Sequence, residues 1–172
     1  MNLNNNKALI FTVLGCNDAY VGFLAGAKYG NQMYEVGIGG DTNTKSFVRR
    51  KVLGQDYGDR SIEANTNGIL SCNEKREFWV DALNGLVRLG KGPTIGLDIV
   101  LEWQDPNPIM PMFAGFMSGW GSTTGCSGCK LEWILQNDCN NGGTEMIISR
   151  EGKGGIRGIL GYPKISGITL AI

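Results

Sequence analysis

The sequence contains no histidine among its 172 residues. Histidine is the commonest general base and a frequent metal ligand. An enzyme built from this chain would therefore depend on carboxylates, lysine, tyrosine or cysteine. The absence of histidine argues against a catalytic function.

An excess of charge of either sign is also missing, because 16 Lys and Arg residues balance 16 Asp and Glu residues. A chain without net charge or a basic run is a poor binder of nucleic acid or of an anionic membrane surface. No apolar run approaches the ~20 residues of a membrane-spanning helix. We therefore expect neither nucleic acid binding nor membrane insertion.

Sustained helical periodicity is absent too, whereas glycine is abundant, with 27 residues. Glycine at this density disfavours helices and suits tight turns and bulges. Many short apolar stretches alternate with turn residues, which predicts one all-β domain over residues 1–172, an antiparallel β-sandwich of the jelly-roll type. The predicted strands are 9–13, 19–25, 33–38, 45–53, 94–103, 112–117, 131–135, 145–149, 156–160 and 165–172, with a loop at 55–67.

The clearest local signal is a hairpin within residues 68–92, centred on Asn84-Gly85. This dipeptide favours a two-residue type I′ turn, in which both central residues have positive φ. The turn fixes the register, so that Asp81 faces Arg88 as an ion pair on the wet side. The residues predicted on the core side are Val80, Ala82, Val87 and Leu89. In the next strand, alternation predicts that Ile95, Leu97, Ile99 and Leu101 share one face.

The chain has five cysteines, an odd number: Cys16, Cys72, Cys126, Cys129 and Cys139. In a glycine-rich β protein this count suggests two internal bridges and one remaining thiol, which in a secreted protein often pairs between chains. The Cys126-x-x-Cys129 spacing also occurs in zinc and redox motifs. However, neither a second such pair nor a histidine completes a zinc site, and no βαβ pattern surrounds it.

Four blocks of sequence follow one another along the chain. They are VLGCNDAYVGF (13–23), YEVGIGGDTNTKSFVRR (34–50), GILSCNEKREFWVDALNGLVRLGKG (68–92) and EWQDPNPIMPMFAGFMSGWGSTTG (102–125). Together they resemble the farnesoic acid O-methyltransferase-like domain family. The resemblance spans residues 11–125, and we expect residues 126–172 to add the C-terminal strands that complete the sandwich.

The family name implies a methyltransferase, and the segment from Glu35 to Asp41 superficially resembles a glycine loop that cradles S-adenosylmethionine. Such a loop needs a strand before it and a helix after it. The segment that follows, TNTKSFVRR, is rich in β-branched residues and has no helical period. We therefore expect Gly39 and Gly40 to turn the chain, and Arg49 and Arg50 to point to opposite faces of a strand.

The same domain type resembles modules of extracellular invertebrate proteins and small galactose-specific lectins of marine invertebrates. This resemblance implies a secreted, non-catalytic protein that binds galactose-containing glycans. We also expect Cys16 to pair with Cys72, since both lie in the matched blocks. One of Cys126, Cys129 and Cys139 is then expected to link two chains into a disulfide-bonded homodimer.

Sugar recognition needs an aromatic surface for the apolar side of the ring and planar polar groups for its hydroxyls. Trp103 and Trp120 are the aromatic candidates, because Trp103 adjoins a polar loop and Trp120 lies between two glycines. A calcium ion can coordinate sugar hydroxyls when hard oxygen ligands hold it. The predicted ligands come from two loops: Glu102, Gln104, Asp105, Asn137 and Asp138, of which Gln104 and Asn137 would also contact the sugar. The same residues could instead simply form turns.

The sequence therefore predicts a calcium-dependent galactose lectin. Two alternatives stay open: an S-adenosylmethionine-dependent O-methyltransferase, as the family name implies, and a structural or adhesive extracellular module. The missing histidine and the context of the glycine segment favour the lectin over the methyltransferase.

Overall fold

The computed structural model describes most of the first two thirds of the chain and parts of the last third. The described residues are 8–26, 32–52, 58–118, 130–135, 146–151 and 157–160. They form strands β1 (Ala8–Gly15), β2 (Ala19–Leu24), β3 (Met33–Gly39), β4 (Lys45–Lys51), β5 (Arg60–Asn65), β6 (Ser71–Leu83), β7 (Leu86–Lys91), β8 (Ile99–Gln104), β9 (Phe113–Ser118), β10 (Lys130–Leu135), β11 (Met146–Glu151) and β12 (Arg157–Leu160), with one helical turn, α1 (Gly40–Asn43).

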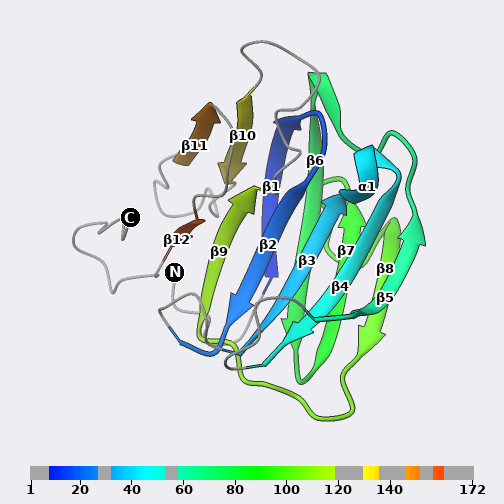
Figure 1. Ribbon diagram of the computed structural model, residues 1–172, viewed down its shortest axis with the longest axis vertical. Helices are drawn as coiled ribbons and strands as arrows, with labels where there is room; N and C mark the ends of the chain where they lie inside the picture. The colour runs from blue at the N-terminus through cyan, green and yellow to red at the C-terminus, as the bar shows by residue number, and fades with distance from the viewer. Residues whose placement is uncertain are drawn as a thin grey trace.

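Two antiparallel sheets of six strands each pack face to face (Figure 1). Sheet 1 has the order β11-β10-β1-β6-β7-β8, and sheet 2 has the order β12-β9-β2-β3-β4-β5. Neighbouring strands in the sheets are often distant in sequence. For example, β1 lies between β6 and β10. The predicted all-β sandwich is confirmed, and the strands after residue 126 extend both sheets.

The core lies between the two sheets and consists of the side chains that point inward, which are every second residue along each strand. Phe11 of β1 is at its centre, with its ring 5.4–6.1 Å from the rings of Phe78, Phe116 and Trp133. These rings come from both sheets and from strands on either side of residue 126. Because their contacts span the sandwich, they fix the spacing of the two sheets.

The predicted hairpin forms β6 and β7 in the expected register, with Val80 opposite Leu89 and Asp81 opposite Arg88. Asn84 and Gly85 both have positive φ, of 52° and 81°. The Arg88 Nε donates to Asp81 over 3.0 Å on the outer side of the sheet. The register prediction and the ion pair are therefore confirmed.

Two strand predictions are wrong, for different reasons. Residues 60–65, expected in a loop, form the edge strand β5. Its polar side is exposed, but Ile62 and Ala64 pack against the core. Residues 94–98 were expected to extend a strand, but β8 begins only at Ile99.

Residues 94–98 form a loop that closes over Trp79 instead. Leu97 accepts a hydrogen bond from the Trp79 indole, 2.9 Å long. Gly96 and Asp98 have positive φ, of 89° and 48°, which breaks the extended conformation. Ile95, Leu97 and Ile99 are consequently exposed by 41%, 59% and 47%, and only Leu101 of the predicted face is buried.

The expected bridge between Cys16 and Cys72 is present, with their Cα atoms 4.3 Å apart. It joins the end of β1 to the start of β6. Cys126, Cys129 and Cys139 lie outside the described residues. No helix in the described segments has the length and hydropathy needed to cross a membrane.

Candidate functional site

The first predicted calcium loop contributes Asp105 to a buried polar network at one end of the sandwich. The Asp105 Oδ2 accepts hydrogen bonds from the Tyr34 hydroxyl (2.9 Å) and the Arg50 Nε (2.7 Å). Its Oδ1 accepts one from the Asn107 backbone N–H (2.9 Å). The Tyr34 hydroxyl in turn accepts from the Ile109 backbone N–H (2.9 Å). We call these five residues the Asp105 network.

This network fastens the loop after β8 to sheet 2. Asp105 is only 2% exposed, and both of its carboxylate oxygens already accept hydrogen bonds from the protein. Burial, together with the hydrogen bond to Asp105, raises the pKa of Tyr34 to about 12. The structure thus gives Asp105 a role in stability, and calcium coordination there would have to compete with Arg50.

The other described residues of the predicted site do not converge with Asp105. Glu102 and Gln104 lie on the outer face of β8, whereas Trp103 is half-buried and its ring packs edge-on against Tyr34 at 6.1 Å. The Gln104 Nε2 donates to the Asn84 and Asp105 carbonyls, both at 3.2 Å. In the described part of the chain, no three Cys, Asp or Glu side chains come together as a metal site. Trp120, Asn137 and Asp138 lie outside the described residues.

The glycine-rich segment connects two antiparallel strands, β3 and β4, through α1. Gly39 turns the chain with a φ of 65°, and positive φ values of 52°, 59° and 65° follow at Asp41, Thr42 and Asn43. Three consecutive non-glycine residues in the left-handed region are uncommon and must be held by their surroundings. The connection is a tight hairpin turn, so it lacks the strand–loop–helix geometry of a cofactor cradle.

Ionic and amide contacts stabilise this turn. The Asp41 carboxylate receives two hydrogen bonds from the Arg60 guanidinium, of 2.6 and 2.7 Å. These contacts lower the pKa of Asp41 and raise that of Arg60. The Asn43 side chain bonds both the N–H and the carbonyl of Leu70, at 3.0 and 2.9 Å. The turn is therefore locked to the segment that leads into β6.

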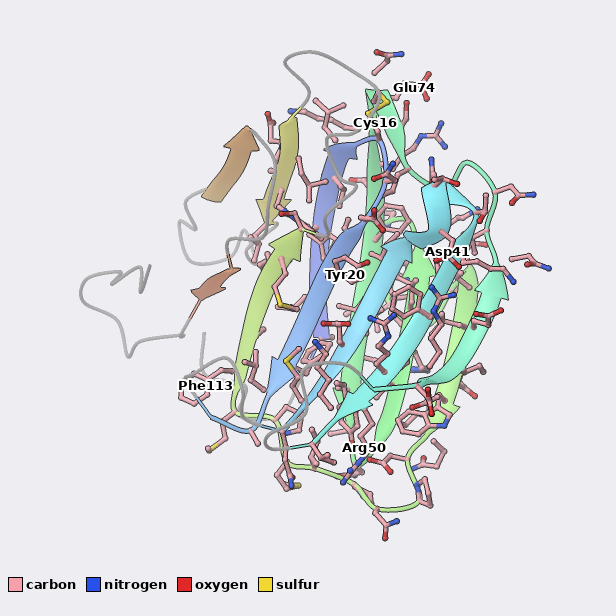
Figure 2. All side chains as sticks on the ribbon, viewed as in Figure 1. Cys16, Tyr20, Asp41, Arg50, Glu74 and Phe113 are labelled. Carbon is pink, nitrogen blue, oxygen red and sulfur yellow. A yellow bond between two sulfur atoms is a disulfide. The ribbon has the colours of Figure 1, made fainter. Side chains whose placement is uncertain are left out.

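The arginines of β4 point to opposite faces, as expected. Arg49 pairs with Glu35 on the outer face of sheet 2 over 3.1 Å. Arg50 reaches Asp105 at the end of the sandwich. Figure 2 shows Arg50 at one end of the molecule, and Cys16, Asp41 and Glu74 toward the other.

A cavity of about 280 Å³ lies toward the Cys16 end, where β6 extends beyond its pairing with β7. Phe78 and Ile69 are buried and form its apolar floor. The lining residues are Ile69, Lys75, Arg76, Glu77, Phe78, Lys91 and Gly92. Three cationic residues and one glutamate therefore line a small, partly apolar space. We call it the β6 cavity.

Two residues near this end bury polar atoms that have no partner. The Arg76 Nε has no hydrogen-bond acceptor, although its Nη2 donates to the exposed Glu74 at 2.9 Å. The Oδ1 of Asn17, beside Cys16, is also unpartnered, and Asn17 is only 8% exposed. Unpaired buried groups are rare in folded proteins and call for a physical explanation.

Comparison with known proteins adds the family. The model of the family described as farnesoic acid O-methyl transferase matches residues 1–126. The chain belongs to this family. The match includes both the glycine segment and every residue that lines the β6 cavity.

Two relatives of this farnesoic acid O-methyltransferase family domain share only part of their length with it. A BTB/POZ domain-containing protein of Arabidopsis thaliana is 25% identical over 105 residues, which are 60% of this chain and 12% of that protein. Uncharacterized protein 5 of Haliotis asinina is 30% identical over 93 residues, or 54% of this chain and 51% of that protein. The chain therefore spans about half of the Haliotis protein and a much smaller part of the Arabidopsis protein. No solved structure matches it.

The β6 cavity of this family domain was not predicted from the sequence, although one signal was available. Arg76 precedes Phe78 and Val80 by two and four residues, so strand alternation puts all three on the inward face of β6. An arginine on a core-facing position needs a partner or a polar space. A charged residue at a position where the strand pattern predicts an apolar one is therefore the sequence signal for the cavity.

Proposed function

We propose that this chain is a secreted, non-catalytic carbohydrate-binding protein whose ligands are galactose-containing glycans. The observation that carries the proposal is the β6 cavity. It offers an apolar floor and several hydrogen-bond donors on a rigid β-sandwich. Small-molecule sites combine these two features, and a pyranose ring has an apolar side and several polar groups that match them.

The absence of a reacting group in the cavity supports binding over catalysis. The titratable groups of the described cavity lining are two lysines, an arginine and a glutamate. None of them is a nucleophile paired with a base, which a group-transfer site would need. The glycine segment that could have cradled S-adenosylmethionine is used as the β3–β4 hairpin turn.

The Cys16–Cys72 bridge supports the extracellular part of the proposal, because disulfides persist mainly in oxidising compartments. We propose calcium as a cofactor in a narrower form than the sequence predicted. Glu102 and Gln104, which do not line the β6 cavity, are kept as ligands together with Asn137 and Asp138, and Asp105 is left to its ion pair with Arg50. An intermolecular bridge through one of Cys126, Cys129 and Cys139 would give a homodimer with two sites, which would raise its avidity for glycan surfaces.

A glycan array probed with and without EDTA tests the proposal. We expect retention on galactose-terminated glycans, and a loss of retention in EDTA would support the calcium ligands. Retention that survives EDTA would remove calcium but keep the lectin. Calorimetric titration with S-adenosylmethionine should give no heat of binding. Micromolar affinity for this cofactor, together with an array that binds no glycan, would favour the methyltransferase.

A further inference from the structure

We infer that the β6 cavity binds an anionic group, a carboxylate or a sulfate ester, carried by an acidic glycan. The inference rests on the proposed glycan binding and specifies the chemical class of the ligand. Its basis is the charge of the cavity lining and the hydrogen-bonding state of those charges.

Two of the three cationic residues of the cavity lie on the same side of sheet 1 because of strand register. Arg76 lies two residues before the buried Phe78, and Phe78 is the register partner of Lys91. Alternation therefore directs Arg76 and Lys91 to the same side of sheet 1 as the apolar floor. Lys75 also lines the space.

Two of the three cationic residues of the cavity pair with carboxylates outside the lining, and the third does not. Lys75 is 3.4 Å from Glu132, and the Arg76 Nη2 contacts Glu74, which is 69% exposed. Within the described residues, the Lys91 ammonium has no carboxylate within ion-pair distance, and it is exposed. Among the described lining residues, Glu77 is the one that carries a carboxylate. Within the described lining, an incoming anion would therefore meet three cationic groups and one carboxylate, with Glu74 and Glu132 as competing partners of Arg76 and Lys75.

The unpartnered Arg76 Nε gives the cavity its most specific feature. A buried N–H of a guanidinium without an acceptor is costly, and the cost is recovered when an anion accepts the hydrogen bond. The planar guanidinium matches the geometry of carboxylate and of sulfate oxygens. The Arg76 side chain is 42% exposed, so an anion can approach its guanidinium from solvent.

The volume limits the size of the ligand group. Pockets for drug-sized ligands enclose roughly 300–1,000 Å³, so a cavity of about 280 Å³ admits one sugar residue or its acidic substituent. The remainder of a longer glycan would extend along the protein surface. The inference is therefore a single anionic subsite.

Three glycosides with one ring test it: methyl galactoside, its 6-sulfate and the corresponding 6-carboxylate, titrated calorimetrically into the full chain. We expect at least one acidic glycoside to bind about 10-fold or more tightly than the neutral one, since a charge-assisted hydrogen bond is added. Whichever anion binds identifies the substituent. The preference should weaken as salt rises from 0.1 to 1 M, because the Debye length falls from about 10 Å to about 3 Å.

Substitutions connect the preference to the cavity. Arg76→Gln should remove it, and Lys91→Gln, at an exposed position, should reduce it about 3-fold and serves if Arg76→Gln does not fold. Lys45→Gln removes the same charge from sheet 2 and should leave the preference unchanged. Equal binding of all three glycosides, or a preference that survives both cavity substitutions, would overturn the anionic subsite and leave galactose binding intact.

A titration with inorganic sulfate separates the two proposals if no glycoside binds. In that case the glycan function fails, and the Arg76 Nε–H resonance in an NMR spectrum decides the anionic subsite alone. A sulfate-dependent shift of that resonance, weakened in Lys91→Gln and unchanged in Lys45→Gln, would support the subsite. An unchanged resonance would overturn it.

Discussion

The two ends of the sandwich use charged residues in opposite ways. At the Arg50 end, Asp105 is buried and every oxygen of its carboxylate accepts a hydrogen bond from the protein. At the Cys16 end, Arg76 and Asn17 bury polar atoms without partners, and three cations surround a cavity. A buried polar side chain whose hydrogen bonds are all formed within the protein stabilises the fold. One that lacks a hydrogen-bond partner in the protein is available to a ligand.

The Cys16 end also depends more on covalent and local restraint. The disulfide joins β1 to β6 there, and Arg60 and Leu70 hold the left-handed turn after β3. The Asp105 network at the other end connects residues up to 75 positions apart through side chains and backbone alone. An end that keeps polar atoms unpaired needs another source of stability, and the bridge supplies one.

The largest expected effect is the loss of that bridge. Replacing both Cys16 and Cys72 by serine should lower the free energy of unfolding by about 4 kcal/mol in the chain-entropy model, since the bridge spans 56 positions. Urea unfolding without reductant measures it. Either single replacement should cost as much, because the bridge needs both thiols. A double variant within 1 kcal/mol of the wild type would mean that the Cys16 end is stable without the bridge.

Next in size is Asp105→Asn, which should lower the free energy of unfolding by about 2–3 kcal/mol. Removing one partner of a buried ion pair leaves the charge of the other uncompensated. The expected loss is moderate because a quarter of the Arg50 side chain is exposed, so that water can solvate its charge. Asp59→Asn, the same change at an exposed position before β5, is the control and should alter stability by less than about 0.5 kcal/mol.

The same unfolding curves distinguish a structural from a calcium-binding Asp105. We expect Asp105→Asn to lose equal stability in calcium and in EDTA. A loss that occurs only when calcium is present would return Asp105 to the set of metal ligands. The contrast between the two ends would then fail, because the Asp105 carboxylate would also be used by a ligand.

These cases indicate which parts of the molecule could be predicted from its sequence. The register of β6 and β7 was predictable because Asn84-Gly85 fixes it locally. The role of Asp105 was not, since its partner Arg50 is 55 positions away and acidic loops suit turns, ion pairs and metals alike. Edge strand β5 was missed because only Ile62 and Ala64 face the core. The 94–98 loop was misassigned because a segment that covers Trp79 can alternate like a strand.

A smaller effect is expected at the turn after β3. Hydrogen bonds from Arg60 hold the pKa of Asp41 below its ordinary value, so the folded state favours the charged carboxylate. Its contribution is present above the unfolded pKa of about 3.9 and is lost as the pH falls through the lower folded pKa. Asp41→Asn should cost about 0.5 kcal/mol at pH 7, since the side chain is half exposed, and progressively less as the pH falls toward 2. Thermal unfolding across this pH range measures the difference. Asparagine also tolerates the left-handed conformation, so the substitution itself should add little backbone strain. A loss of stability that is as large at low pH as at pH 7 would mean that strain, and not the lost charge, destabilises the variant.

The smallest expected effect is that of Arg76→Gln on stability, which we compare with the same substitution of Arg50 at the other end. Arg50→Gln should lower the free energy of unfolding by about 2 kcal/mol, because it leaves Asp105 with one ionic partner fewer in a buried site. Arg76→Gln should change it by less than about 0.5 kcal/mol. The Arg76 Nε forms no hydrogen bond that could be lost, and its Nη2 contacts only an exposed carboxylate. Removing its charge also relieves repulsion from Lys75 and Lys91 in the cavity.

Parallel urea titrations of the two variants give the comparison directly. A loss at Arg76 as large as that at Arg50 would mean that the cationic groups of the β6 cavity are already used to hold the fold, and the distinction between a closed end and a ligand-binding end would not stand.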